Sequence, residues 1–154
     1  MKIKIKKLDP SAIIPTRNNP DDCGLDLYAL ESVELYPGTI KKIRTGIAVQ
    51  LEYNIGEMFV HGFKKFGLFI HDRSGLGSKG IHRFAGVVDQ SYTGELLIIL
   101  FNSNSADKSV PFVINKGDKI AQLVIQEIFT PEIIEVDQLD ETVRGDKGFG
   151  SSGK

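Results

Sequence analysis

A short run between residues 73 and 80 combines the residue types that bind oxyanions. The segment RSGLGSKG contains two cations, two hydroxyl groups and three glycines. These side chains donate hydrogen bonds to phosphate oxygens, and glycine lets backbone N–H groups approach closely. The Gly-Lys-Ser/Thr order of a Walker A loop is absent. The run therefore predicts either a phosphate-binding loop or a polar hairpin turn.

A second segment could supply acid–base chemistry. The sequence GVVDQSYTG, from Gly86 to Gly94, places Asp89 three residues before Tyr92 and between two apolar strands. A carboxylate beside apolar walls can act as a general base. An aspartate at a strand end more often caps a turn, so both interpretations of Asp89 stay open here.

The remaining polar candidates carry weaker signals. Gln122 stands on a predicted strand, either as a polar ligand or as a solvated side chain. His61, His71 and His82 lie about ten residues apart and lack the short pairings of zinc ligands, so we interpret them as structural. Cys23 has no base beside it and is predicted to be a buried structural thiol.

The elements that position these residues are predicted to be β-strands. Ile3 and Ile5 alternate with lysines, and Ile47, Val49 and Leu51 alternate with smaller or polar residues. Such alternation, broken by frequent turns, predicts an all-β sandwich or barrel. The turns are expected at Pro37-Gly38, Asn54 to Gly56, Ser103-Asn104 and Asn115 to Asp118.

One strand is apolar on both faces. Residues 96–101 read LLIILF, which predicts a central strand covered by a second sheet or by another subunit. By contrast, the tail RGDKGFGSSGK from Arg144 is rich in glycine and serine and cannot fold alone. We therefore expect a β domain over residues 1–142 and a flexible arm over residues 143–154.

Composition narrows the function classes. With 154 residues, 41% of them hydrophobic, the chain fits one domain. Its 19 basic and 20 acidic residues argue against a protein that coats nucleic acid. A single cysteine, no apolar signal core and no apolar run of about 18 residues predict a cytoplasmic or otherwise intracellular protein that does not enter membranes.

Five segments stand in an order that resembles the motifs of the trimeric dUTPase family. They read CGLDLYA, RSGLGSKG, GVVDQSYTGE, GDKIAQL and RGDKGFGSSG, and they span Cys23 to Gly153. The resemblance implies a distorted β jelly-roll and a homotrimer with active sites at the subunit interfaces. It also implies hydrolysis of dUTP to dUMP and pyrophosphate, which limits uracil incorporation into DNA and supplies dUMP for dTTP synthesis.

The resemblance assigns roles at the phosphates. Asp89 matches the carboxylate that deprotonates a water for attack on the α-phosphorus. Mg²⁺ is implied as a cofactor held by substrate phosphates and water, with Asp26 either an indirect contributor or only structural. The arm is implied to close over the site. The residues matched to phosphate contacts are Arg73, Ser74, Gly75, Gln122, Arg144, Gly150, Ser151 and Ser152, with Lys79 as an additional candidate.

The resemblance also assigns residues to contacts with the uracil base and the deoxyribose. The main chain around Gly86, Val87 and Val88 is expected to hydrogen-bond uracil, with Phe149 stacked on it. Tyr92 is expected to exclude a 2′-hydroxyl, and the alternative interpretation is that it is a core tyrosine. This chain departs from the family pattern at Lys147, where glycine is usual, at Ser91, where an acidic residue is common, and in its short segment between Lys79 and Gly86.

Two other functions are compatible with parts of this sequence pattern. The dCTP deaminase family resembles this chain but requires a catalytic glutamate, and the matching position here is Ile99. A noncatalytic jelly-roll module or a regulator is the other alternative. The presence of Asp89, Arg144 and Phe149 favours a catalyst.

Overall fold

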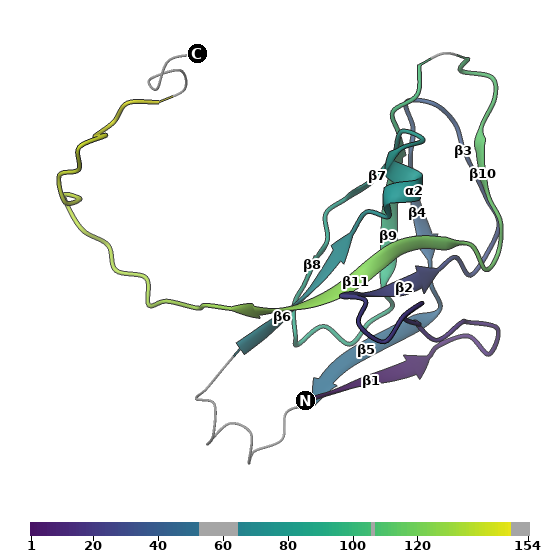
Figure 1. The fold of residues 1–154 in the computed structure, drawn as a ribbon, viewed down its shortest axis with the longest axis horizontal. Helices are drawn as coiled ribbons and strands as arrows, with labels where there is room; N and C mark the ends of the chain where they lie inside the picture. The colour runs from purple at the N-terminus through teal and green to yellow at the C-terminus, as the bar shows by residue number, and fades with distance from the viewer. Residues whose placement is uncertain (53–64, 106, 149–154) are drawn as a thin grey trace.

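The computed structural model describes residues 1–52, 65–105 and 107–148, and their regular structure is almost entirely antiparallel β-sheet (Figure 1). A four-stranded sheet has the order β2 (Gly24–Tyr28), β11 (Lys119–Ile128), β6 (Lys65–His71), β8 (Val87–Val88). A three-stranded sheet has the order β4 (Ile40–Arg44), β9 (Leu97–Asn102), β7 (Ile81–Phe84). Two smaller sheets pair β1 (Lys2–Lys7) with β5 (Ile47–Glu52), and β3 (Val33–Leu35) with β10 (Phe112–Ile114). The predicted all-β, jelly-roll-like fold is confirmed.

The period-two pattern sets the register of the first pair. Ile3 lies opposite Leu51 and Ile5 opposite Val49, and these side chains face the core while the intervening lysines are exposed. A slip of one residue would turn the lysines inward, so burial fixes the register. The predicted alternation in both segments is confirmed.

The sheets enclose one continuous core. Leu27 and Leu123 enter it from the four-stranded sheet, and Ile43, Ile98 and Leu100 enter from the three-stranded sheet, each at most 1% exposed. A single apolar cluster of this kind holds the strands together by removing their inner faces from water.

The apolar strand β9 is central, as predicted, between β4 and β7. Its two faces differ, because Ile98 and Leu100 are buried while Leu97 is 38% exposed and Ile99 and Phe101 are half-buried. The core covers one face of the strand. The other face is only partly covered within a single chain.

The chain leaves the sheets after β11. Residues 129–148 contain no strand and no helix, and their side chains are exposed (Figure 1). The described residues contain one short helix, α2 (Ser74–Gly77), and no helix able to span a membrane. The division expected at residue 142 stays a prediction, and the turn expected at 54–56 lies outside the described residues.

Candidate active site

The cationic segment connects β6 to β7 through one helical turn. Arg73 is the N-cap of α2, in an extended conformation, and its carbonyl accepts hydrogen bonds from the N–H groups of Leu76 and Gly77. The first N–H groups of a helix have no intrahelical acceptor, which leaves those of Ser74 and Gly75 facing outward at exposed residues. The segment is thus a helical turn, and its polar hairpin alternative is wrong.

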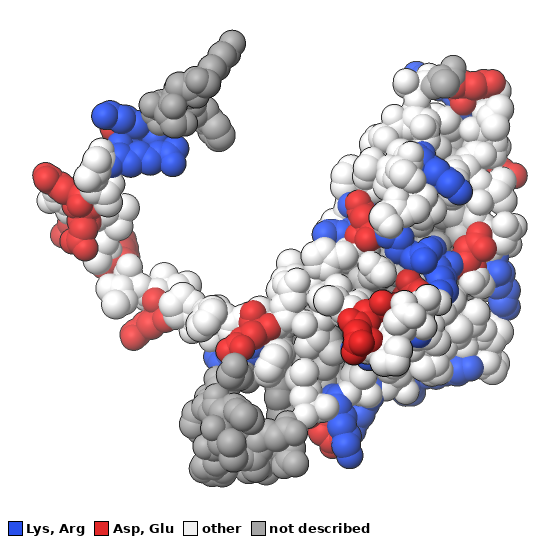
Figure 2. Space-filling model, in the orientation of Figure 1, with Lys and Arg blue, Asp and Glu red and all other residues white. Residues whose placement is uncertain are grey.

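A buried carboxylate holds the side chain of Arg73. Asp26, 4% exposed, accepts a hydrogen bond from Arg73 Nε at 3.0 Å, and its other oxygen lies 2.8 Å from Lys119 Nζ. Arg73 Nη1 also donates to the carbonyl of Lys119 at 3.2 Å. The hydrogen bond to Asp26, and secondarily its charge, raises the pKa of Lys119. Two cations around one anion leave a net positive charge, and Figure 2 shows basic and acidic side chains gathered on this face.

Strand pairing explains why these groups meet. Asp26 on β2 lies opposite Gln122 on β11, and a bulge between Lys119 and Ala121 interrupts the pairing. A bulge turns the side chains beside it, which here directs Lys119 to the carboxylate. Sequence reasoning missed Lys119, although its place three residues before Gln122 puts it near the predicted phosphate contacts.

Gln122 lies on the central strand of the four-stranded sheet, between Asp26 and His71. Its side chain covers Gly24, where an added Cβ would lie 3.1 Å from Gln122 Cβ and 3.2 Å from its Cδ. Gly24 therefore leaves room for the glutamine. Within the described part of the chain, the buried His71 Nε2 has no hydrogen-bond partner.

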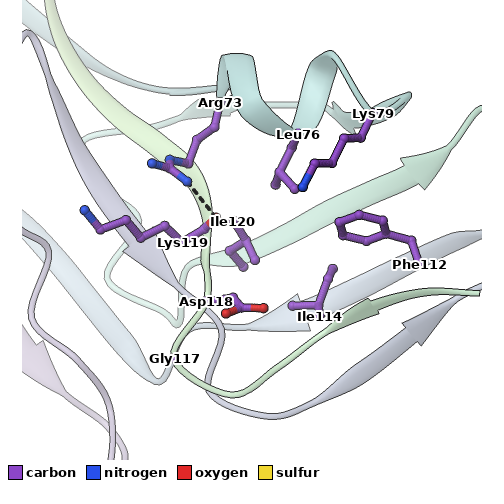
Figure 3. A pocket seen from close by; sticks show the side chains of 9 residues that line it. All are labelled: Arg73, Leu76, Lys79, Phe112, Ile114, Gly117, Asp118, Lys119 and Ile120. Atoms are coloured by element: carbon purple, nitrogen blue, oxygen red, sulfur yellow. Dashed lines mark hydrogen bonds between the residues drawn. The ribbon is translucent and has the colours of Figure 1, made fainter.

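A cavity of about 360 Å³ opens beside the cationic segment (Figure 3). Arg73 and Lys119 line it together with Lys79, whose ammonium lies 5.9 Å from the centroid of the Phe112 ring. Three cations therefore line the cavity, together with the carboxylate of Asp118. Lys79 joins the same region as Arg73, as the motif that contains both residues predicts.

The segment expected to read uracil forms a turn with positive φ at Ala85 and Gly86, followed by β8. Val87 and Val88 pair with Phe69 and Leu68, and Gly86 accepts a hydrogen bond from Ile70 N at 2.7 Å. Gly86 has φ +133°, and a Cβ there would lie 2.8 Å from the Ile70 carbonyl. Only glycine fits this position.

A second cavity, of about 260 Å³, gathers the base and sugar candidates around the carboxylate. Tyr92 is 46% exposed and donates from its hydroxyl to the Glu95 carbonyl, so the alternative of a core tyrosine is wrong. Asp89 is exposed at the rim, where its carbonyl accepts from Tyr92 N. The lining residues are Ile70, Val87, Val88, Asp89, Tyr92, Glu95, Leu96 and Leu97.

The structure brings the candidates together as two separate groups. The two cavities share no lining residue. Val88 lies opposite Leu68 on β6, whereas Arg73 follows the end of that strand, five residues after Leu68. Arg144 lies on the exposed segment, where it donates to the Lys147 carbonyl. Phe149, Gly150, Ser151 and Ser152, like His61, lie outside the described residues.

One prediction about a side chain is wrong. Cys23 was expected to be buried, yet it is exposed. It precedes β2 at the point where the chain enters the sheet, so burial begins one residue later, at Gly24.

An all-β fold with a cationic segment and a carboxylate beside an apolar cavity is compatible with an enzyme that acts on a phosphorylated substrate. The dUTPase family model matches residues 10–153. The deoxyuridine 5′-triphosphate nucleotidohydrolase of Mycolicibacterium gilvum is 40% identical, with 98% of this chain and 94% of that protein covered. The enzyme of the same name from Mycobacterium tuberculosis is 38% identical over the same shares. This chain therefore belongs to the dUTPase family, the enzymes that hydrolyse dUTP.

Solved structures agree with this assignment. A mutant dUTPase of Staphylococcus bacteriophage 80alpha with dUpNHpp superposes with a TM-score of 0.79, at 30% identity and 99% coverage of both chains. A mutant dUTPase from phage phi11 of S. aureus, in which a structural Mg(II) ion is coordinated, gives a TM-score of 0.74 at 27% identity, covering 90% of this chain and 98% of that one.

Proposed function

We propose that Asp89 is the general base for hydrolysis of dUTP to dUMP and pyrophosphate. The carboxylate takes a proton from a water, the water oxygen attacks the α-phosphorus, and the bond to the bridging oxygen of the β-phosphate breaks. The observation that carries this proposal is the position of Asp89 on the rim of an apolar cavity. Among the described residues no cation lies within ion-pair distance of Asp89, so its carboxylate is available to a water.

The cavity supports selection of deoxyuridine. Val87 and Val88 line this cavity directly after Gly86, and we expect a thymine methyl to overlap the backbone there. A buried donor or acceptor left unpaired by cytosine would cost about 1–3 kcal/mol. Tyr92, held by its bond to Glu95, is placed to exclude a 2′-hydroxyl. Phe149 would cover the other face of the base.

The cationic segment supports binding of the triphosphate. Arg73, Ser74 and Gly75 present a guanidinium, a hydroxyl and outward N–H groups, and Gln122 and Lys79 lie on the same side. From the arm, Arg144 would add a guanidinium, while Gly150, Ser151 and Ser152 would add backbone and hydroxyl donors. Charge spread over the transferring phosphates is the main catalytic demand in such reactions.

Mg²⁺ fits this arrangement through the substrate. In residues 1–52, 65–105 and 107–148, no three His, Cys, Asp or Glu side chains are grouped to hold a metal ion. Both oxygens of Asp26 already contact cations, so any contribution from it goes through water. Mg²⁺ binds readily to phosphate oxygens and water, where it would neutralise charge on the triphosphate.

We further infer that the protein is a homotrimer whose sites join parts of different copies. Two observations support this assembly: the two groups line separate cavities, and the apolar face of β9 is partly exposed. The segment after β11 adds exposed apolar side chains that a partner copy would cover. They are Phe129, Ile133, Ile134, Val136, Leu139 and Val143.

The test of the mechanism is Asp89→Asn. Asparagine keeps the shape but cannot take the proton, so we expect dUTP to bind while kcat falls at least about a hundredfold. The control is Asp107→Asn, an exposed loop carboxylate that caps Ser109. Pyrophosphate release from dUTP, dCTP, dTTP and UTP measures both. Unchanged kcat in Asp89→Asn, or ammonia release from dCTP, would refute the proposal.

A further inference from the structure

Arg83, on β7, links the cationic segment to the turn before β8. Its backbone N–H donates to Asp72 Oδ1 at 2.8 Å, and its Nε lies 3.8 Å from the same oxygen. Its Nη1 donates to the carbonyl of Ala85. Asp72 directly precedes Arg73. Arg83 therefore connects the start of the cationic segment with the turn that precedes β8.

The turn that Arg83 holds has an unfavourable backbone. Ala85 has φ +60°, which side-chain-bearing residues adopt rarely, and Gly86 follows at φ +133°. A Cβ on Gly86 would collide with Arg83 Nη1, so the guanidinium packs directly against this glycine. Such a backbone persists only where neighbouring groups fix it. The Arg83 side chain, from the adjacent strand β7, contacts this turn through the Ala85 carbonyl.

The charge of Arg83 is already compensated. Asp72 lies beside the guanidinium, and the same carboxylate is 3.5 Å from His82 Nδ1. These contacts fix the orientation of the Arg83 guanidinium, with one nitrogen on the turn carbonyl.

We propose that Arg83 is a positioning residue for base selection, which sets the place of the Gly86 and Val87 backbone by holding the Ala85 carbonyl. This inference rests on the proposed function, in which that backbone reads uracil. Arg83 touches no substrate itself. Its loss should therefore change which nucleotide is accepted more than it changes hydrolysis in general.

The test compares Arg83→Met and Arg83→Lys with His82→Gln. His82 is the neighbouring residue on β7 and contacts the same carboxylate, but no bond joins it to the turn. We expect both Arg83 variants to lower the ratio of kcat/KM for dUTP to that for dTTP by roughly tenfold or more. The ratio for dUTP to dCTP should fall as well. His82→Gln should keep both ratios, and Asp72→Asn should lower them by less.

Each result decides the inference. A fall in the ratios of the Arg83 variants, with His82→Gln unchanged, supports it. Equal loss for all nucleotides would make Arg83 a general anion-attracting group, and constant ratios with a lower melting temperature would make it only structural. Either result overturns the inference. Failure of the proposed function is distinguishable, because the unaltered protein would then show no preference for dUTP.

Discussion

The backbone and the packing of the described chain do not require glycine at Gly75 or Gly77. Neither has a positive φ, and an added Cβ at either position would meet nothing within 4 Å. Gly24 and Gly86 differ, because Gln122 and the Ile70 carbonyl fill their space. The described chain thus gives no steric reason for glycine at either open position, and at Gly75 we propose that close approach of the phosphates supplies one.

The two open glycines provide a matched pair of variants. Gly75→Ala and Gly77→Ala should each leave the free energy of unfolding unchanged or raise it by about 0.5–1 kcal/mol, because alanine favours a helix. Only Gly75→Ala should raise KM for dUTP, since its methyl group would meet phosphate oxygens. Chemical denaturation and steady-state kinetics measure both effects. Equal KM values for the two variants would remove Gly75 from the phosphate site.

Residue types and spacing predicted the candidate site residues, but they did not predict which side chains contact those residues. The Asp89 and Arg73 segments were predicted from composition and spacing. The contact of Asp26 with Arg73 and Lys119 was not, because it joins three segments whose proximity depends on the pairing of β2 with β11 and on a bulge. Burial of Cys23 was predicted from the usual behaviour of cysteine and is wrong, since strand ends follow local geometry.

At the scale of elements, the strands were predictable and their order in the sheets was not. Period-two alternation predicts β1 and β5 because each strand has one face toward water. The helical turn α2 has no apolar periodicity to reveal it, as its four residues bury no side chain. The order β2-β11-β6-β8 joins strands far apart in the sequence, which no local pattern specifies.

The segment after β11 is the element with the clearest functional prediction. Its described end contacts only itself, through Arg144 with Lys147 and Gly145 with Thr142. A chain ending at Thr142 should therefore keep its melting temperature but lose kcat, because the arm would no longer expel water from the phosphates. Arg144→Met should lose part of the activity and Lys147→Met little. An unchanged kcat in the truncated chain would contradict a catalytic arm.

At the scale of the whole molecule, a single chain carries two separate parts of the proposed active site, each incomplete by itself. The cationic half and the Asp89 half have separate cavities, and an apolar strand face and apolar side chains after β11 stay exposed. Figure 2 shows acidic groups spaced along that segment, with basic groups further along it. Symmetric assembly covers such surfaces and can bring one half from each of two copies together.

Complementation between two inactive variants tests this central claim most directly. Arg73→Met damages the phosphate half and Asp89→Asn the catalytic half, and the two proteins are unfolded, mixed equally and refolded together. If each site takes Arg73 from one copy and Asp89 from another, random assembly restores roughly a quarter of the unaltered activity. Variants refolded separately should stay inactive. A mixture that also stays inactive would show that both residues serve a site within one chain, and would contradict the account.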